Sequence, residues 1–173
     1  MKKQVGIISI INEKHVTNGI LISLVITTIV YIITSTPYLP TGQFLYIRTL
    51  LAADLQFIIG NVIGERYSLK QCQPKQPFLK YGMIVGIVGG IFSALIISIY
   101  QTFLDGFRGF ENFNFLVFLF IYIGTFLISG VVIGLLTGAI VGTYYMYKEA
   151  KAESKIETDD KIDDDFYKDL LDE

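Results

Sequence analysis

Residue types that build reactive sites are scarce in this chain of 173 residues. It has no tryptophan, one cysteine (Cys72) and one histidine (His15). A single cysteine excludes a disulfide within the chain and a cysteine-rich metal site, and a single histidine excludes a histidine cluster. The sequence also lacks a glycine-rich phosphate loop, a nucleophile elbow and the HExxH pattern of zinc proteases. We therefore expect no enzyme activity, no metal and no cofactor.

Hydrophobic sequence is abundant instead. Hydrophobic residues make up 52% of the chain, and its mean hydropathy is +0.53. A membrane helix needs about 20 consecutive apolar residues, and four segments reach that length: 16–36, 44–64, 81–104 and 113–147. The pattern predicts an all-α integral membrane protein with four transmembrane helices in residues 16–147. Residues 1–15 form a cytoplasmic N-terminal segment, and residues 148–173 form a tail.

Lysine and arginine positions predict the orientation, because these residues concentrate in cytoplasmic flanks. Residues 1–15 hold three lysines, and the loop 65–80 holds Arg66 and three lysines. By contrast, the connection 35–43 has no charge, and the connection 105–112 has Arg108 as its one basic residue. We expect both termini in the cytoplasm, in an inner or plasma membrane. The basic loop then faces membrane lipids, and its lysines are too few to indicate nucleic-acid binding.

Small residues recur every four positions in the last two apolar segments. Because lipid gives helices no hydrophobic reason to associate, close backbone approach through small residues supplies much of their attraction. The series predicts a tightly packed third and fourth helix, and Gly19, Ser23 and Thr27 form a weaker seam on the first. The alternative is a glycine zipper that forms homo-oligomers and permeabilises or shapes membranes. The two series are Gly82, Gly86, Gly90 and Ala94, and Gly130, Gly134, Gly138 and Gly142.

The second apolar segment is the most polar of the four. Asp54 lies near its middle, where a carboxylate costs about 2.5 to 3.5 kcal/mol on insertion scales. Asn61 shares its helix face, and Gln56 and Arg48 add polarity. This candidate intramembrane site indicates a proton or cation relay, or a site for a basic group. The alternatives are a structural bond from Asp54 to Thr27 or Thr28, and an Arg48 that reaches for outer headgroups or Asp105.

The tail from residue 148 carries eleven acidic and five basic residues. Its first part can prolong the last helix, but the acidic block that follows predicts mostly disorder. Four apolar residues there, Phe166, Tyr167, Leu170 and Leu171, could dock on a protein partner while the acids steer the approach. The alternative is a solvated tail without a partner.

Residues 78–104, FLKYGMIVGIVGGIFSALIISIYQTFL, with their Ile-Tyr-x-x-Phe ending, resemble the central helix of a bacterial membrane family, domain of unknown function 4199. The segment FLISGVVIGLLTGAIVGTYYMYKEAK is similar to the family's last helix. The chain departs from the family in having only DGFRGFEN between these helices. The resemblance implies a four-helix membrane protein and no known activity.

These observations favour a non-enzymatic membrane component, either an accessory subunit or a small scaffold. The alternative function is a small transporter or channel that uses Asp54.

Overall fold

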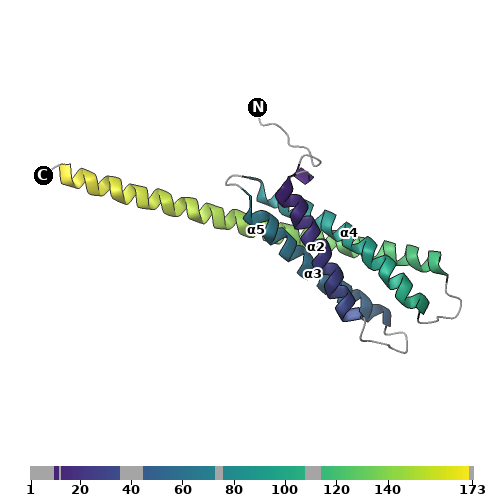
Figure 1. Ribbon diagram of the computed structural model, residues 1–173. Helices are drawn as coiled ribbons and strands as arrows, with labels where there is room; N and C mark the ends of the chain where they lie inside the picture. Colours follow the sequence, from purple (N-terminus) through teal and green to yellow (C-terminus); the bar gives the residue numbers. More distant parts are fainter. Residues whose placement is uncertain (1–9, 12, 36–44, 73–75, 108–113, 172–173) are drawn as a thin grey trace.

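In the computed structural model, four long helices account for most of the chain (Figure 1). They are α2 (Lys14–Ser35), α3 (Leu45–Lys70), α4 (Phe78–Phe107) and α5 (Phe115–Leu171). The structure describes residues 10–11, 13–35, 45–72, 76–107 and 114–171, and gives no side-chain detail for residues 35, 45–53, 107 and 155–171. The predicted all-helical class is confirmed.

The surface of the bundle differs from that of a water-soluble domain, although apolar residues also fill its core. Large apolar side chains face outward, among them Phe120 at 71%, Ile128 at 67% and Ile140 at 70% exposure. Polar side chains such as Asn61 and Glu65 are fully buried. Within the described residues, three stretches are long and apolar enough to cross a membrane: Lys14–Thr34, Phe78–Gly106 and Phe115–Ser154. The arrangement indicates a membrane protein, because lipid solvates apolar surface and excludes unpaired polar groups.

Helices α4 and α5 form the most extensive interface in the bundle. They run antiparallel, so that Gly82 lies opposite Gly138, Gly86 opposite Gly134, and Gly90 opposite Gly130. A Cβ atom added to Gly82 would lie 2.6 Å from the carbonyl oxygen of Gly138, which is closer than real Cβ contacts. The two glycine series singled out in the sequence therefore lie backbone to backbone.

A second seam of small residues joins α2 to α3. A Cβ atom added to Gly19 would lie 2.8 Å from the carbonyl oxygen of Gly64, and one added to Gly60 would overlap the Thr27 hydroxyl. Ser23 packs against Gly64 in the same seam. The sequence analysis found the α2 half of this seam but not Gly60, Gly64 and Ser68, which continue it at the same four-residue interval on α3.

Two predicted boundaries differ from the structure. The loop expected at residues 65–80 is helical as far as Lys70 and again from Phe78, because the buried face of α3 continues past the end of its apolar run. Helix α5 continues as far as Leu171, through a segment expected to be mostly disordered. Extension from an existing helix avoids the nucleation cost that makes short isolated helices marginal.

Figure 1 shows two helix pairs, α2 with α3 and α4 with α5, that meet and then diverge toward the ends of α2 and α4. The C-terminal part of α5 extends away from the bundle as a straight rod.

Replacing Gly86 or Gly134 with leucine should destabilise the protein strongly, because each side chain would overlap the facing backbone. Overpacking typically costs about 1–3 kcal/mol, and a contact with rigid backbone belongs at or beyond the upper end. The measurement is heat-induced loss of the monodisperse, detergent-solubilised protein.

Gly124→Leu is the matched control, since an added Cβ there meets nothing within 4 Å. It places the same side chain on the helix that carries Gly134 and should leave heat resistance near that of the parent. Equal resistance of all three variants would show that the α4–α5 seam does not hold the bundle together.

Candidate functional site

Helix α3 brings a carboxyl group into the middle of the bundle. Glu65 is fully buried where α3 meets α4 and α5. Its Oε1 accepts a hydrogen bond of 2.8 Å from the Thr137 hydroxyl of α5. The same oxygen lies where a Cβ of Gly86 would be, so the absence of a side chain at Gly86 makes room for the carboxyl group. Glu65 Oε2 has no hydrogen-bond partner among the described residues.

A second polar contact lies one helical turn from Glu65. Asn61, on the same face of α3, accepts a hydrogen bond of 2.5 Å from the Ser23 hydroxyl of α2 through its Oδ1. Both side chains are completely buried, and Gly89 of α4 packs against Ser23. Within the described part of the chain, Asn61 Nδ2 and Ser68 Oγ, like Glu65 Oε2, have no partner. Asn61, Glu65 and Ser68 thus form a buried polar stripe along α3, facing the other three helices.

A connected hydrogen-bond network occupies the opposite end of the bundle. The Tyr31 hydroxyl of α2 donates to Gln101 Oε1 at 2.7 Å, and Gln101 Nε2 donates to Asp105 Oδ1 at 3.1 Å. The Tyr122 hydroxyl of α5 donates to the other oxygen of Asp105. The network ties α2, α4 and α5 together, and it includes Asp105, the residue expected from the sequence as an alternative partner of Arg48.

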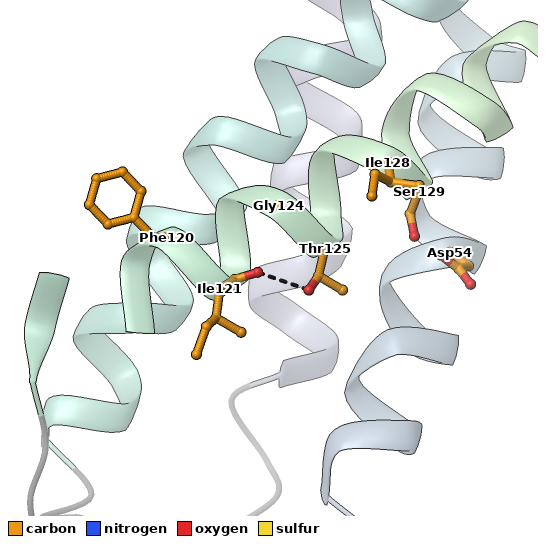
Figure 2. A pocket seen from close by; sticks show the side chains of 7 residues that line it. All are labelled: Asp54, Phe120, Ile121, Gly124, Thr125, Ile128 and Ser129. Carbon is orange, nitrogen blue, oxygen red and sulfur yellow. Dashed lines mark hydrogen bonds between the residues drawn. The ribbon is translucent and has the colours of Figure 1, made fainter. Parts of the chain in front are cut away.

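Asp54 lies in a different place from the Glu65 stripe. It borders a pocket of about 580 Å³ between α3 and α5, together with a row of α5 residues (Figure 2). Asp54 Oδ1 is buried without a partner among the described residues. In Figure 2 Asp54 lies across from Ser129, and the Thr125 hydroxyl donates back to the Ile121 carbonyl at 2.8 Å. The α5 residues are Phe120, Ile121, Gly124, Thr125, Ile128 and Ser129.

The structure separates the residues predicted to form one polar site. The bond expected from Asp54 to Thr27 or Thr28 is absent, since the hydroxyls of both threonines and Asp54 Oδ1 have no partner within the described chain. Gln56 instead donates to the Thr34 hydroxyl, and Asn61 contacts Ser23. The side chains of Arg48 and of the tail residues Phe166, Tyr167, Leu170 and Leu171 lie outside the part described in side-chain detail.

A third polar cluster joins the start of α2, the end of α3 and the start of α4. The Tyr81 hydroxyl donates to Glu13 Oε1 at 2.6 Å, and His15 Nε2 lies 3.5 Å from Glu13 Oε2. Cys72 Sγ also lies 3.5 Å from His15 Nε2. In a catalytic triad the acid holds the other ring nitrogen and leaves one free for the nucleophile. Here the carboxylate and the thiol approach the same nitrogen, so the cluster does not activate Cys72.

The electrostatics of Cys72 agree with an unreactive thiol. Burial and, second, the negative charge of Glu13 raise the pKa of Cys72 to about 11 from an ordinary value of 9.0. Reactive cysteines have the opposite environment, with a lowered pKa and nearby positive charge. Although Glu13, His15 and Cys72 lie together, the described residues contain no group of three or more histidine, cysteine or acidic side chains arranged so that it could hold a metal ion.

Sequence reasoning missed Glu65 because the apolar run of α3 stops at Gly64, which placed the next residue in a loop. A usable signal was present nonetheless. Gly60, Gly64 and Ser68 keep the four-residue interval across that boundary, as do Asn61 and Glu65 on the adjacent positions. An interval that continues past an apolar run indicates that the helix and its buried face continue as well.

Comparison with known proteins gives no assignment. No protein-family profile, curated protein or solved structure matches the chain. The resemblance to domain of unknown function 4199 therefore stays a prediction.

Cys72 should react with maleimide far more slowly than a free thiol at about pH 8. A pKa two units above the ordinary value leaves about one hundredth of the thiolate, and the thiolate is the reactive form. Labelling rates can be followed by intact mass in mild detergent, with the same protein in denaturant as the control. Labelling of the folded protein as fast as the denatured one would contradict the buried environment of Cys72.

Proposed function

We propose that the chain is a non-enzymatic membrane component, a scaffold or accessory subunit, that projects the end of α5 from the membrane to bind a protein partner. The observation that carries this proposal is the length of α5, a continuous helix of 57 residues. At about 1.5 Å per residue it measures roughly 85 Å, whereas the hydrocarbon core of a bilayer is about 30 Å thick. Much of α5 must lie outside the membrane.

The composition of α5 changes where it leaves the bundle. Tyr144 and Tyr147 are exposed, as expected for aromatic residues at a membrane interface. Beyond them the exposed residues become charged, from Lys148 through Glu153. In helical register, positions 166, 167, 170 and 171 fall on one face of α5, and acidic residues flank these four apolar residues in the sequence. Such a face suits docking into an apolar groove with a basic rim.

The proposed topology places this projecting arm, residues 148–173, in the cytoplasm. Four spans with both termini inside put the basic segments 1–15 and 65–80 on the cytoplasmic side, where lysine and arginine accumulate. In this proposal helix α3 also spans the membrane, in addition to the three apolar stretches on α2, α4 and α5. It carries more charged residues than α2 or α4, and Asn61 and Glu65 on its polar face are buried against the other helices.

Replacing Phe166, Tyr167, Leu170 and Leu171 with serine in the full-length protein should abolish capture of the partner by affinity purification after crosslinking in cells. Deleting residues 156–173 should have the same effect. The membrane level and heat resistance of the protein should not change, because the arm lies outside the packed bundle. Quantitative mass spectrometry of the captured proteins is the measurement.

The matched control replaces Asp163, Asp164 and Asp165 with asparagine, which keeps the apolar residues and removes charge. This variant should keep the partner but bind it more slowly and with weaker salt dependence. The proposal fails if the chain lacking residues 156–173 captures the same partners as the full chain. It also fails if protease added outside intact cells removes the arm.

A second candidate function, transport of a cation or a basic molecule, is supported by the Asp54 pocket. The pocket combines a buried carboxylate oxygen, which has no partner among the described residues, with a mostly apolar lining on α5 that includes the hydroxyl residues Thr125 and Ser129. The close contact of α4 with α5 at Gly86 and Gly134 argues against transport, because it leaves no space between these two helices. A continuous polar path from Asp54 to both membrane surfaces would require this seam to open.

Asp54→Asn should leave proton and cation fluxes through reconstituted vesicles unchanged, because the leading proposal gives Asp54 no transport role. Fluxes can be followed with pH-sensitive and ion-sensitive dyes, and protein-free vesicles set the background. A flux above background that Asp54→Asn abolishes would put transport ahead of the scaffold function.

A further inference from the structure

Glu65 is the most enclosed acidic group in the described part of the bundle. It lies on α3, with Gly86 of α4 and Thr137 of α5 against its carboxyl group. The residue has no exposed surface. An ionised carboxylate in such a place loses its hydration, and one hydrogen bond from a hydroxyl does not replace it.

The surrounding groups can satisfy the neutral acid better than the carboxylate. The Thr137 hydroxyl lies 2.8 Å from Glu65 Oε1 and 3.0 Å from the Ile133 carbonyl oxygen. If the Glu65 proton sits on Oε1, Glu65 can donate to Thr137, and Thr137 can donate to the Ile133 carbonyl. Both hydroxyl protons then have acceptors. In the ionised state Thr137 must turn toward Glu65, and Oε2 keeps a negative charge without a donor from the described residues.

The titratable groups on the neighbouring elements have other partners. On α2, His15 contacts Glu13 and Cys72, and on α4 Tyr81 donates to Glu13. On α5, the Tyr145 hydroxyl donates to the backbone carbonyl of Arg66 at 3.5 Å. Arg66 follows Glu65 on α3, but its side chain is exposed.

The close packing also limits what can bind. The carboxyl oxygen and the Gly134 carbonyl both occupy the space that a single Cβ at Gly86 would need. A metal ion requires several ligands at coordination distance, and the described residues provide no such group of histidine, cysteine and acidic side chains. A proton needs no additional space.

We infer that Glu65 is a proton-binding site, at which an acid held neutral by α3, α4 and α5 couples the packing of the bundle to pH. The bound proton lets α3 dock against the α4–α5 pair, and its loss places an uncompensated charge at the point of closest helix contact. Thr137 is the positioning residue that orients the acid. This site is independent of the arm at the end of α5 and of the Asp54 pocket.

Infrared difference spectroscopy of the full-length protein in lipid vesicles tests the proposal directly. The carbonyl stretch of a protonated carboxylic acid is separate from the bands of carboxylates. Wild-type protein at about pH 7 should show a protonated-acid band that Glu65→Gln lacks and that Asp54→Asn, the matched control, retains. Thr137→Val should shift the frequency of this band, because it removes the hydrogen-bonding hydroxyl and keeps the shape.

Thermal unfolding in mild detergent provides the second measurement. A proton bound more tightly by the folded state stabilises it at low pH, and this contribution is lost as pH rises. The unfolding equilibrium of wild type should shift by up to about tenfold per pH unit relative to Glu65→Gln between about pH 4.3, where glutamic acid titrates in an unfolded chain, and the pH at which the infrared band disappears, with no further shift above that pH. Glu65→Gln should be folded throughout, because the amide reproduces the hydrogen-bond donor of the neutral acid.

Identical infrared spectra of wild type and Glu65→Gln at about pH 7 would overturn the proposal, since Glu65 would then be ionised. Failure of Glu65→Gln to fold would also overturn it, because a required negative charge is incompatible with a neutral acid. Parallel pH dependences of unfolding in the two proteins would show that the proton is not coupled to packing.

Discussion

Contact between helix backbones is the constraint on which this structure depends. In lipid, side-chain burial gives helices little reason to associate, so they must approach closely enough for dispersion and polar contacts to hold them. Glycines at a four-residue interval permit this for α4 and α5, and Gly19, Gly60 and Gly64 permit it for α2 and α3. The bundle is therefore two tightly joined antiparallel pairs, and Glu65 lies where these pairs meet.

Helix α3 shows the consequence most clearly. Its polar residues would oppose membrane insertion of an isolated helix, yet most of those described in side-chain detail face other helices. Asn61 meets Ser23, Glu65 meets Thr137, and Gln56 meets Thr34. The seam with α2 brings Asn61 and Gln56 within hydrogen-bond distance of that helix, whereas the partner of Glu65 is on α5. Small residues and polar residues on α3 therefore depend on each other, because the small ones create the shielded space that the polar ones need.

The helical class and the two glycine series could be predicted, because both depend on local composition and on an interval along one helix. A hydropathy window could not place Asp54 or Glu65, because burial depends on neighbours that such a window does not contain, and only the four-residue interval that continues past Gly64 indicated the burial of Glu65. Asp54 looked central on its own helix but borders a pocket beside α5, whereas Glu65 looked like a loop residue and is enclosed. Composition likewise predicted disorder in the tail, since it does not register that α5 is already a helix when it reaches those residues.

Glu65 and the α4–α5 seam are parts of one fit. Gly86 has no side chain, and the space this leaves is filled from one direction by the Gly134 carbonyl and from another by the Glu65 carboxyl group. A larger residue at Gly86 would separate α4 from α5 and displace α3 at the same time. Because the helices are in close contact beside Glu65, they cannot separate locally to make room for a charge on its carboxyl group. The strain must then be relieved by movement of α3 as a whole, which is how a single buried acid can affect an entire helix bundle.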